Sequence, residues 1–410
     1  ALAAYPAVHA RELLKLQRGD LSARVVFAIT ANGLGNRVHP LLSSFALALV
    51  QDAALVVRWT PRGCDRQADL EALAGNCGGE EKEGIEDHFK HPGFNWTVSF
   101  ALCGFRHRTP TTICVSNLLH PNVYPREGKS RQVPMGTYYQ DEHQDVVRRA
   151  NLSEAPWNTT IVVHTWHRFL REVLCNPGVA ESGLFPPDQL EAQRALEEYL
   201  LVPTDAIAAA AARGVEAAGG CALGLHLRDK SGQRYNNHTV HEQRPGDIFA
   251  NFPVQNEAEL WPRLRAAMAG RGDEKNGGGL FIAADGHSQG LRARLVDAAR
   301  RENVKIVEPD WLGSKPPIEL VAYTENLILS QCAQLVPTGH PPSTFFAMAA
   351  ARAVASNPRV RAALACPASR VEASPLSPSG ESQPCLFEPS CPDPSVRFSG
   401  GHNKFGILHR

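Results

Sequence analysis

The sequence lacks several patterns that would place it in a common class of protein. Ten cysteines are present, but no two stand in C-x-x-C spacing, which disfavours a zinc ribbon or thioredoxin-type chemistry. No D-x-D pair and no H-E-x-x-H motif occurs, so two frequent signatures of a divalent-metal site are missing. No apolar run reaches the roughly 18 residues of a membrane span. We therefore expect no metal, and contact with a membrane only through an anchor outside this sequence.

An excess of charge of either sign is also missing. The 42 Lys and Arg residues balance the 42 Asp and Glu residues, whereas a general nucleic-acid-binding protein would carry a basic excess. Nucleic acid is thus not an expected partner, although a few arginines would suffice to bind one anionic small molecule.

The cysteines, an even number, accompany four N-x-S/T sequons at Asn95, Asn151, Asn158 and Asn237. Together they favour the lumen of the secretory pathway, with some cysteines in disulfides. The alternative is a cytosolic protein with buried thiols.

A chain of 410 residues is too long for one small core, so two domains are expected. The pattern predicts a strand over residues 24–30, a helix over 36–51 and a strand over 54–59, followed by an irregular segment over 61–130. Beyond residue 220, strands over 221–228, 279–285, 304–310 and 333–339 alternate with helices. This alternation is typical of an α/β fold with parallel sheets.

We therefore predict two Rossmann-like domains, covering residues 1–205 and 206–360. A tail rich in proline, serine and cysteine follows over 361–410.

The first predicted strand leads into the stretch "ANGLGNRVHP", residues 31–40. Glycines at a strand-to-helix turn allow the backbone to approach a phosphate or a sugar. Gly33 and Gly35 fit a dinucleotide fingerprint, but Val38 stands where the third glycine belongs, and no acid ends the second strand. An NAD(P) site and a purely structural turn remain the alternatives.

The strand over 221–228 ends in His226 and Arg228, which share one face because strand side chains alternate. Ligands of open α/β sheets bind at the carboxyl ends of strands, and a guanidinium there suits a diphosphate. A structural salt bridge is the alternative for Arg228.

Two further strand ends carry polar groups. Asp285 follows an apolar strand and can accept hydrogen bonds from the N–H edge of guanine, unless it only caps the next helix. Ser343 and Thr344 open a late helix, where hydroxyls and backbone N–H groups bind anions or simply cap the helix.

In their order along the chain, these motifs resemble the fucosyltransferase-like GT-B superfamily. That group includes protein O-fucosyltransferases and the α1,6- and α1,2-fucosyltransferases. The matching stretches are the glycine turn Gly-Leu-Gly-Asn at 33–36, His-Leu-Arg at 226–228 and Ser-Thr-Phe at 343–345.

The resemblance implies a GT-B-like fold, with two Rossmann-like domains facing a cleft and a C-terminal domain that binds the nucleotide. It implies metal-independent, inverting transfer of fucose from GDP-fucose to a glycan or glycoprotein hydroxyl, in the Golgi. Arg228 would bind the β-phosphate, Asp285 would read guanine and Asn36 would reach the donor from the N-terminal domain. The implied donor-binding set is Gly33, Gly35, Asn36, Arg37, His226, Arg228, Asp285, Ser343, Thr344 and Phe345.

The sequence departs from the superfamily where a catalytic base is expected. Leu34 occupies a position at which some relatives carry a glutamate, and Asp229 follows Arg228 where several carry a second arginine. Arg228, Asp229 and Glu242 are therefore the catalytic candidates, the two acids as alternative bases. A non-catalytic nucleotide-sugar- or glycan-binding relative is the second interpretation.

Overall fold

The structure is a computed structural model of the chain. It describes residues 2–18, 20, 22–30, 34–59, 84–97, 112–116, 137–138, 147–148, 150–152, 160–164, 169–228, 234–235, 238–239, 256–269, 278–286, 288–337 and 344–356. The predicted tail over 361–410 lies outside these residues, as does most of the predicted irregular segment over 61–130.

The described residues form two compact units, called unit 1 up to Thr204 and unit 2 from Asp205 onward. The division falls one residue before the end of the first predicted domain. No described helix is long and apolar enough to cross a membrane.

Unit 1 contains twelve of the described elements. In chain order they are η1 (Leu2–Ala4), α1 (Tyr5–Gln17), β1 (Val25–Thr30), α2 (Leu34–Val50), β2 (Ala54–Trp59), η2 (Ile85–Asp87), β3 (Thr112–Ser116), β4 (Thr137–Tyr138), β5 (Thr160–His164), α6 (Leu170–Leu174), α7 (Pro177–Ser182) and α8 (Gln189–Leu200).

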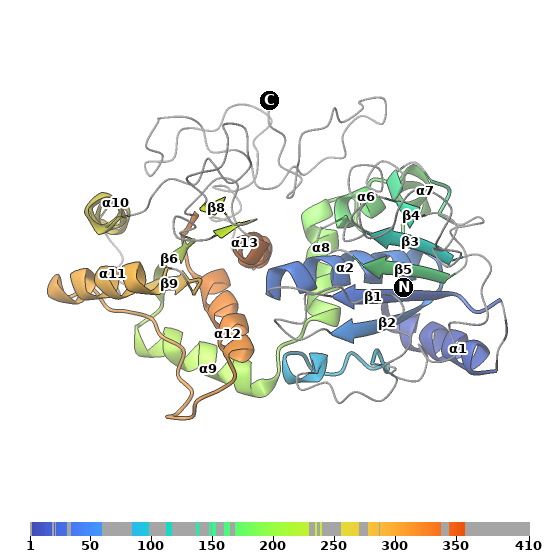
Figure 1. Cartoon of the computed structure of the whole chain (residues 1–410), viewed down its shortest axis with the longest axis horizontal. Coiled ribbons are helices and arrows are strands. Elements are labelled where there is room, and N and C mark those ends of the chain that lie inside the picture. Colours follow the sequence, from blue (N-terminus) through green and yellow to red (C-terminus); the bar gives the residue numbers. More distant parts are fainter. Residues whose placement is uncertain are drawn as a thin grey trace. The chain divides into compact units, whose positions relative to one another are not determined.

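The sheet of unit 1 is parallel, with the strand order β2-β1-β5-β3-β4 (Figure 1). The interior strand β1 is buried, as the apolar run predicted, and Val25 and Val26 are fully inaccessible to solvent. Helix α2 packs on β1 and buries Leu41 and Phe45 completely. The predicted strand–helix–strand start of the chain is thus confirmed.

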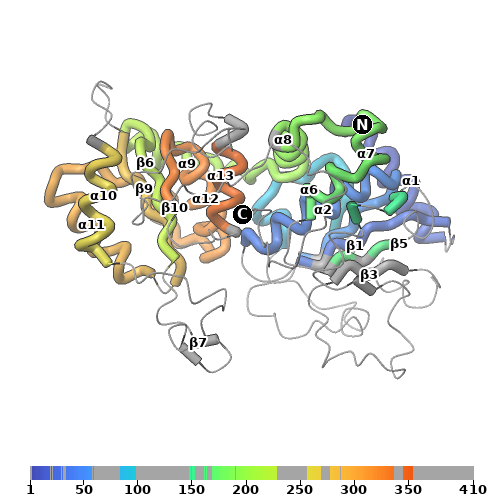
Figure 2. Tube along the Cα trace, turned by 90° about the horizontal axis from the view of Figure 1, so that it is seen from above, coloured from blue at the N-terminus to red at the C-terminus, as the bar shows by residue number. Residues whose placement is uncertain are grey.

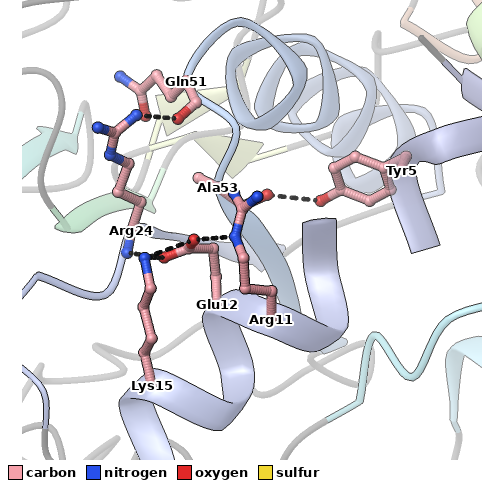
Figure 3. A network of polar contacts seen from close by, with 7 residues as sticks. All are labelled: Tyr5, Arg11, Glu12, Lys15, Arg24, Gln51 and Ala53. Atoms are coloured by element: carbon pink, nitrogen blue, oxygen red, sulfur yellow. Dashed lines mark hydrogen bonds and ion pairs between the residues drawn. The ribbon is translucent and has the colours of Figure 1, made fainter. Parts of the chain in front are cut away.

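Helix α1, which the sequence pattern did not predict, is held to the sheet by a buried tyrosine (Figure 3). The Tyr5 hydroxyl donates to the Ala53 carbonyl at 3.0 Å and accepts from the Leu55 N–H at 2.8 Å. Burial is the main cause of the raised pKa of Tyr5. The phenol therefore stays neutral and fixes the start of α1 at the first residues of β2.

The same helix carries a buried glutamate with a complete set of partners (Figure 3). The Glu12 carboxylate accepts from Arg11 Nε at 2.8 Å, from Lys15 Nζ at 2.9 Å and from the Arg24 backbone N–H at 3.0 Å. Burial opposes its ionisation, but these donors outweigh burial and the pKa of Glu12 is lowered. This ionised network joins α1 to the residue just before β1.

Unit 2 contains the remaining ten described elements. They are α9 (Asp205–Ala217), β6 (Cys221–Leu227), β7 (Arg234–Tyr235), β8 (His238–Thr239), α10 (Glu257–Ala269), β9 (Gly279–Ala284), α11 (Gln289–Arg301), α12 (Ile318–Gln331), β10 (Leu335–Pro337) and α13 (Thr344–Ser356).

The main sheet of unit 2 is parallel, with the order β10-β6-β9. Figure 2 shows α10 and α11 on one side of these strands and α9, α12 and α13 on the other. Unit 2 is therefore a three-layer α/β structure, as the alternating pattern predicted.

The predicted strand over residues 304–310 is too long. Of these residues only Ile306 forms a β-bridge, with Leu280 of β9. Two features explain the early end. Arg292 Nε donates to the Ile282 carbonyl at 2.8 Å, which occupies the acceptor that a longer strand would have used. Pro309 has no N–H to donate to a ladder.

Helix α12 approaches β6 unusually closely. A Cβ atom at Gly224 of β6 would lie only 2.7 Å from the Leu329 side chain, so this position requires glycine. A disulfide joins Cys221, the first residue of β6, to Cys332, which directly follows α12. The end of α12 is therefore fixed over the start of β6, and the helix runs antiparallel to that strand.

Candidate functional site

The two faces of strand β6 differ: one is apolar and the other carries polar side chains. Leu223, Leu225 and Leu227 belong to the core beneath α10 and α11. Side chains alternate along a strand, so Gly224 and His226 belong to the opposite face, which α12 covers. Arg228 is the residue directly after β6, and its sharing of this face with His226 stays a prediction, although its charge acts on His226.

His226 lies inside unit 2, with 4% of its surface exposed. Its ring stacks on Phe345 of α13, with centroids 5.1 Å apart and planes at 25°. Burial lowers the pKa of His226 to about 3, and the positive charge of Arg228 adds to the effect. The imidazole is thus neutral at physiological pH and joins the end of β6 to the start of α13.

Arg228 and Asp285 follow neighbouring strands directly. Leu227 of β6 pairs with Ala284 of β9, and the Asp285 N–H donates to the Leu227 carbonyl at 3.3 Å. Both side chains are partly buried. Burial lowers the pKa of Arg228, and the negative charge of Asp285 opposes that shift. A guanidinium and a carboxylate are thus placed together at the carboxyl ends of two strands, where α/β proteins bind ligands.

Asp285 also organises the start of α11. Its Oδ1 accepts from the Ser288 N–H at 3.0 Å and from the Ser288 hydroxyl at 2.6 Å. Asp285 is not itself the cap, because the N-cap residue of α11 is Ser288; Asp285 instead fixes the turn that leads into the helix. Both bonds from Ser288 end on Oδ1, so Ser288 does not use Oδ2 of Asp285. Recognition of guanine by Asp285 stays a prediction.

A second carboxylate on this side of the sheet was missed by the sequence analysis. Glu325 lies one helical turn before Leu329, the residue that contacts Gly224, and α12 runs antiparallel to β6, so Glu325 belongs nearer the carboxyl ends of the strands. Burial raises the pKa of Glu325 to about 7, and the charge of Arg292 opposes the shift. An acid in the middle of the largely apolar stretch "VAYTENLILS" is the signal that sequence reasoning had available.

The first turn of α13 is held by side chains of α12. Asn326 Nδ2 donates to the Phe345 carbonyl at 2.8 Å, and its Oδ1 accepts from Arg352 at 3.4 Å. Arg352 also donates to the Tyr323 hydroxyl at 2.8 Å. This buried network and the stacking of His226 fix the start of α13 relative to β6.

In unit 1, the glycine turn follows β1 at the point where the strand order reverses, because β2 and β5 flank β1. Helix α2 starts at Leu34, and Asn36 is partly exposed. Arg37 is 2% exposed, and its guanidinium lies 5.1 Å from the centre of the Trp59 ring. This position gives Arg37 a packing role in unit 1. Donor contacts by Asn36, Arg37 and Gly35 stay predictions.

Several predicted site residues have no described position. Gly33, Asp229, Glu242 and Ser343 lie outside the described residues, and nothing is described of the Thr344 side chain. Among the residues that are described, no three His, Cys, Asp or Glu side chains gather in a way that could hold a metal ion.

Comparison with solved structures bears on the fold. A mutant of Arabidopsis thaliana FUT1 in complex with GDP is 17% identical and has a TM-score of 0.51, with 86% of this chain and 76% of that chain covered. The two chains share a fold. The predicted resemblance to the fucosyltransferase-like group is therefore confirmed at the level of the fold, as are the mixed α/β architecture and its parallel sheets.

Weaker similarity was found to two further structures. Fucosyltransferase NodZ from Bradyrhizobium is 15% identical, with 80% of this chain and 92% of that chain covered and a TM-score of 0.43. POFUT1 in complex with GDP is 12% identical, with coverages of 81% and 95% and a TM-score of 0.41. No protein-family model and no curated protein matches the chain.

Proposed function

We propose that the chain is a metal-independent, inverting glycosyltransferase that transfers fucose from GDP-fucose to a hydroxyl of a glycan or glycoprotein. The observation that carries this proposal is the position of Arg228, partly buried beside Asp285 at the carboxyl ends of β6 and β9. The fold shared with a GDP-bound protein supports a guanine nucleotide as the ligand.

Arg228 acts on the leaving group. The acceptor oxygen forms a bond to the anomeric carbon while the bond from that carbon to the β-phosphate oxygen breaks, and negative charge grows on the departing GDP. A guanidinium fixed in position stabilises that charge without first having to reorganise. Attack opposite to the leaving group converts the β-linked donor into an α-linked product.

The two partly buried carboxylates, Asp285 and Glu325, are the candidates for reading the base. A carboxylate accepts from the N1–H and N2–H groups of guanine, which adenine does not present in this arrangement. Glu325 makes no hydrogen bond with the other described residues, and burial holds its pKa near 7, so N–H donors from a base would favour its ionised form. The catalytic base, for which Asp229 and Glu242 are the candidates, stays a prediction.

The first experiment is a calorimetric titration of the chain with GDP, ADP, UDP and NAD. We expect GDP to bind more tightly than the other three. Asp285→Asn and Glu325→Gln should each be compared with wild type for the preference for GDP over ADP. The variant that loses this preference identifies the base-reading residue.

The second experiment measures hydrolysis of a panel of nucleotide sugars, followed by an acceptor array with the donor that is consumed. Consumption of GDP-fucose and formation of an α-linked product support the proposal. GDP binding without transfer to any acceptor would indicate a non-catalytic binding protein, and tighter binding of NAD would indicate an oxidoreductase.

We also propose that the chain works in the lumen of the secretory pathway, where GDP-sugars meet glycoproteins. The Cys221–Cys332 disulfide supports an oxidising compartment. Fractionation of the native cells, with the chain followed by antibody, tests this proposal.

A further inference from the structure

One sequon is described over its whole length. Asn95, Trp96 and Thr97 form an N-x-T triplet between η2 and the later strands, and all three have described positions. Each of the other three sequons has at least one residue outside the described part of the chain. The proposed glycosyl transfer makes no use of this triplet.

The backbone of the triplet is fixed while the Asn95 side chain is outside. The Asn95 carbonyl accepts from His9 Nε2 at 2.8 Å, and the Trp96 carbonyl accepts from the Val57 N–H at 2.7 Å. Trp96 is completely buried, whereas Asn95 is exposed. Trp96, which lies between Asn95 and Thr97, thus anchors the segment and leaves Asn95 in solvent.

The amide nitrogen of Asn95 is available for modification. Within the described part of the chain, the only hydrogen-bond contact of the Asn95 side chain is one that Oδ1 accepts from the Thr97 hydroxyl, at 3.5 Å. That hydroxyl has a stronger acceptor in Glu86, at 2.6 Å. Nδ2 therefore has no bond within the fold that a sugar would have to replace.

The triplet lies at an edge of the sheet. Strand β2 is the outer strand of the unit 1 sheet, and Val57 is its point of contact with Trp96. The described side chains of β2 are buried, and the Trp96 carbonyl occupies the outward-facing Val57 N–H at this edge. A glycan on Asn95 would stand in solvent next to this edge without displacing the buried Trp96.

We propose that Asn95 carries an N-linked glycan. In the reaction, Nδ2 of Asn95 forms a bond to the anomeric carbon of an oligosaccharide carried on a lipid diphosphate. The bond from that carbon to the diphosphate breaks, and the lipid diphosphate leaves as the amide loses one proton. The Cys221–Cys332 disulfide is an independent sign of the oxidising compartment in which such donors occur.

The test is to direct the full chain into the secretory pathway of eukaryotic cells and to map its peptides by mass spectrometry. Treatment with a glycan-releasing amidase in isotopically labelled water converts a glycosylated asparagine to labelled aspartate. We expect label at Asn95, and an intact mass for Asn95→Gln that is lower by one glycan.

Thr97 provides matched variants. Thr97→Ala removes the sequon and should abolish label at Asn95, whereas Thr97→Ser keeps the sequon and should retain it. Unlabelled Asn95 in the secreted wild-type chain would overturn the proposal, whether or not the other sequons are labelled. Because this measurement does not involve GDP or fucose, it stands or falls apart from the proposed enzymatic activity.

Discussion

Units 1 and 2 each remove a glutamate from solvent, and the two carboxylates respond in opposite ways. Glu12 of unit 1 is 1% exposed on its side chain, yet three donors hold it ionised and lower its pKa. Glu325 of unit 2 is partly buried without a hydrogen bond to another described residue, and burial raises its pKa to about 7. A carboxylate with all its partners inside the protein serves the fold, and the lack of such partners is why Glu325 is proposed as a ligand-binding residue.

The buried histidines extend the comparison. Burial lowers the pKa of His9 to about 4 and that of His226 to about 3, so both imidazoles are neutral. His9 bonds to the Asn95 carbonyl and packs against Phe94, whereas His226 adjoins the charge of Arg228 at the end of β6. A shifted pKa alone thus does not mark a functional site. The two histidines differ in the charge beside them, and that difference is the reason for proposing a site at His226 and not at His9.

The largest expected effect comes from removing the charge at that strand end. Arg228→Ala should lower turnover of GDP-fucose by about 10²–10³-fold, because a transition-state charge donor is lost. Steady-state kinetics at saturating donor measures it. The matched control is Arg300→Ala on α11, whose side chain is 60% exposed beside Glu308.

The control should retain turnover within about twofold, because exposed ion pairs contribute little. Near-normal turnover in Arg228→Ala would remove the basis of the proposed mechanism, because no other charged residue in the described part of unit 2 has been assigned to the leaving group.

The next effect concerns the pH dependence of stability. The folded pKa of Glu325, about 7, lies above its ordinary value of 4.5. The folded state therefore favours the protonated acid, and this stabilisation is complete below about pH 4.5 and lost as pH rises through 7. Its size is at most about 3 kcal/mol. Glu325→Gln should abolish that loss, as measured by urea unfolding at pH 5 and pH 7.5.

The two histidines titrate equally in wild type and variant, so their opposite contribution, which weakens the fold as pH falls below 6.5, cancels in the comparison. If both proteins lose the same stability between the two pH values, Glu325 is not the buried acid that the structure indicates.

The corresponding change in unit 1 should affect stability alone. Glu12→Gln weakens bonds from two cations and one backbone N–H, and we expect a loss of about 2 kcal/mol of unfolding free energy at pH 7. Calorimetric titration should show unchanged GDP affinity. A weaker affinity in Glu12→Gln would contradict the division between structural and ligand-binding acids.

The sequence predicted much of this arrangement because strand ends are visible in the pattern. The boundaries of β2, and those of β9 to within one residue, follow from apolar runs, and alternation puts His226 on the face opposite Leu225 and Leu227. Helix α1 was not predicted, because its buried positions include Tyr5, His9 and Glu12, which do not form an apolar stripe. Pattern analysis reads apolar burial well and polar burial poorly.

Glu325 was missed for a related reason. Its helix, Ile318–Gln331, is one of those expected between the strands of the C-terminal half, but an acid in the middle of such a helix matches no motif. Only the close approach of α12 to Gly224 places it on the side of His226. The strand over 304–310 was predicted to be longer than it is, which is an error of the opposite kind. The apolar residues of "VKIV" contain no sign that Arg292 bonds the Ile282 carbonyl of β9, which a longer strand would need.

The smallest expected effect separates positioning from binding. Asn326 donates to the Phe345 carbonyl and so fixes the start of α13, the predicted phosphate-binding turn, without itself being assigned to the ligand. Asn326→Leu should weaken GDP binding about tenfold, the value of one lost hydrogen bond, while GMP binding changes less, because GMP lacks the β-phosphate.

Ser330→Ala, which removes a hydroxyl bonded only locally to the Leu327 carbonyl, is the matched control on the same helix. Calorimetry with both nucleotides gives the affinity ratio, and a general loss of stability would weaken GDP and GMP equally. An unchanged ratio in Asn326→Leu would show that the start of α13 does not hold the β-phosphate, even where wild type binds GDP.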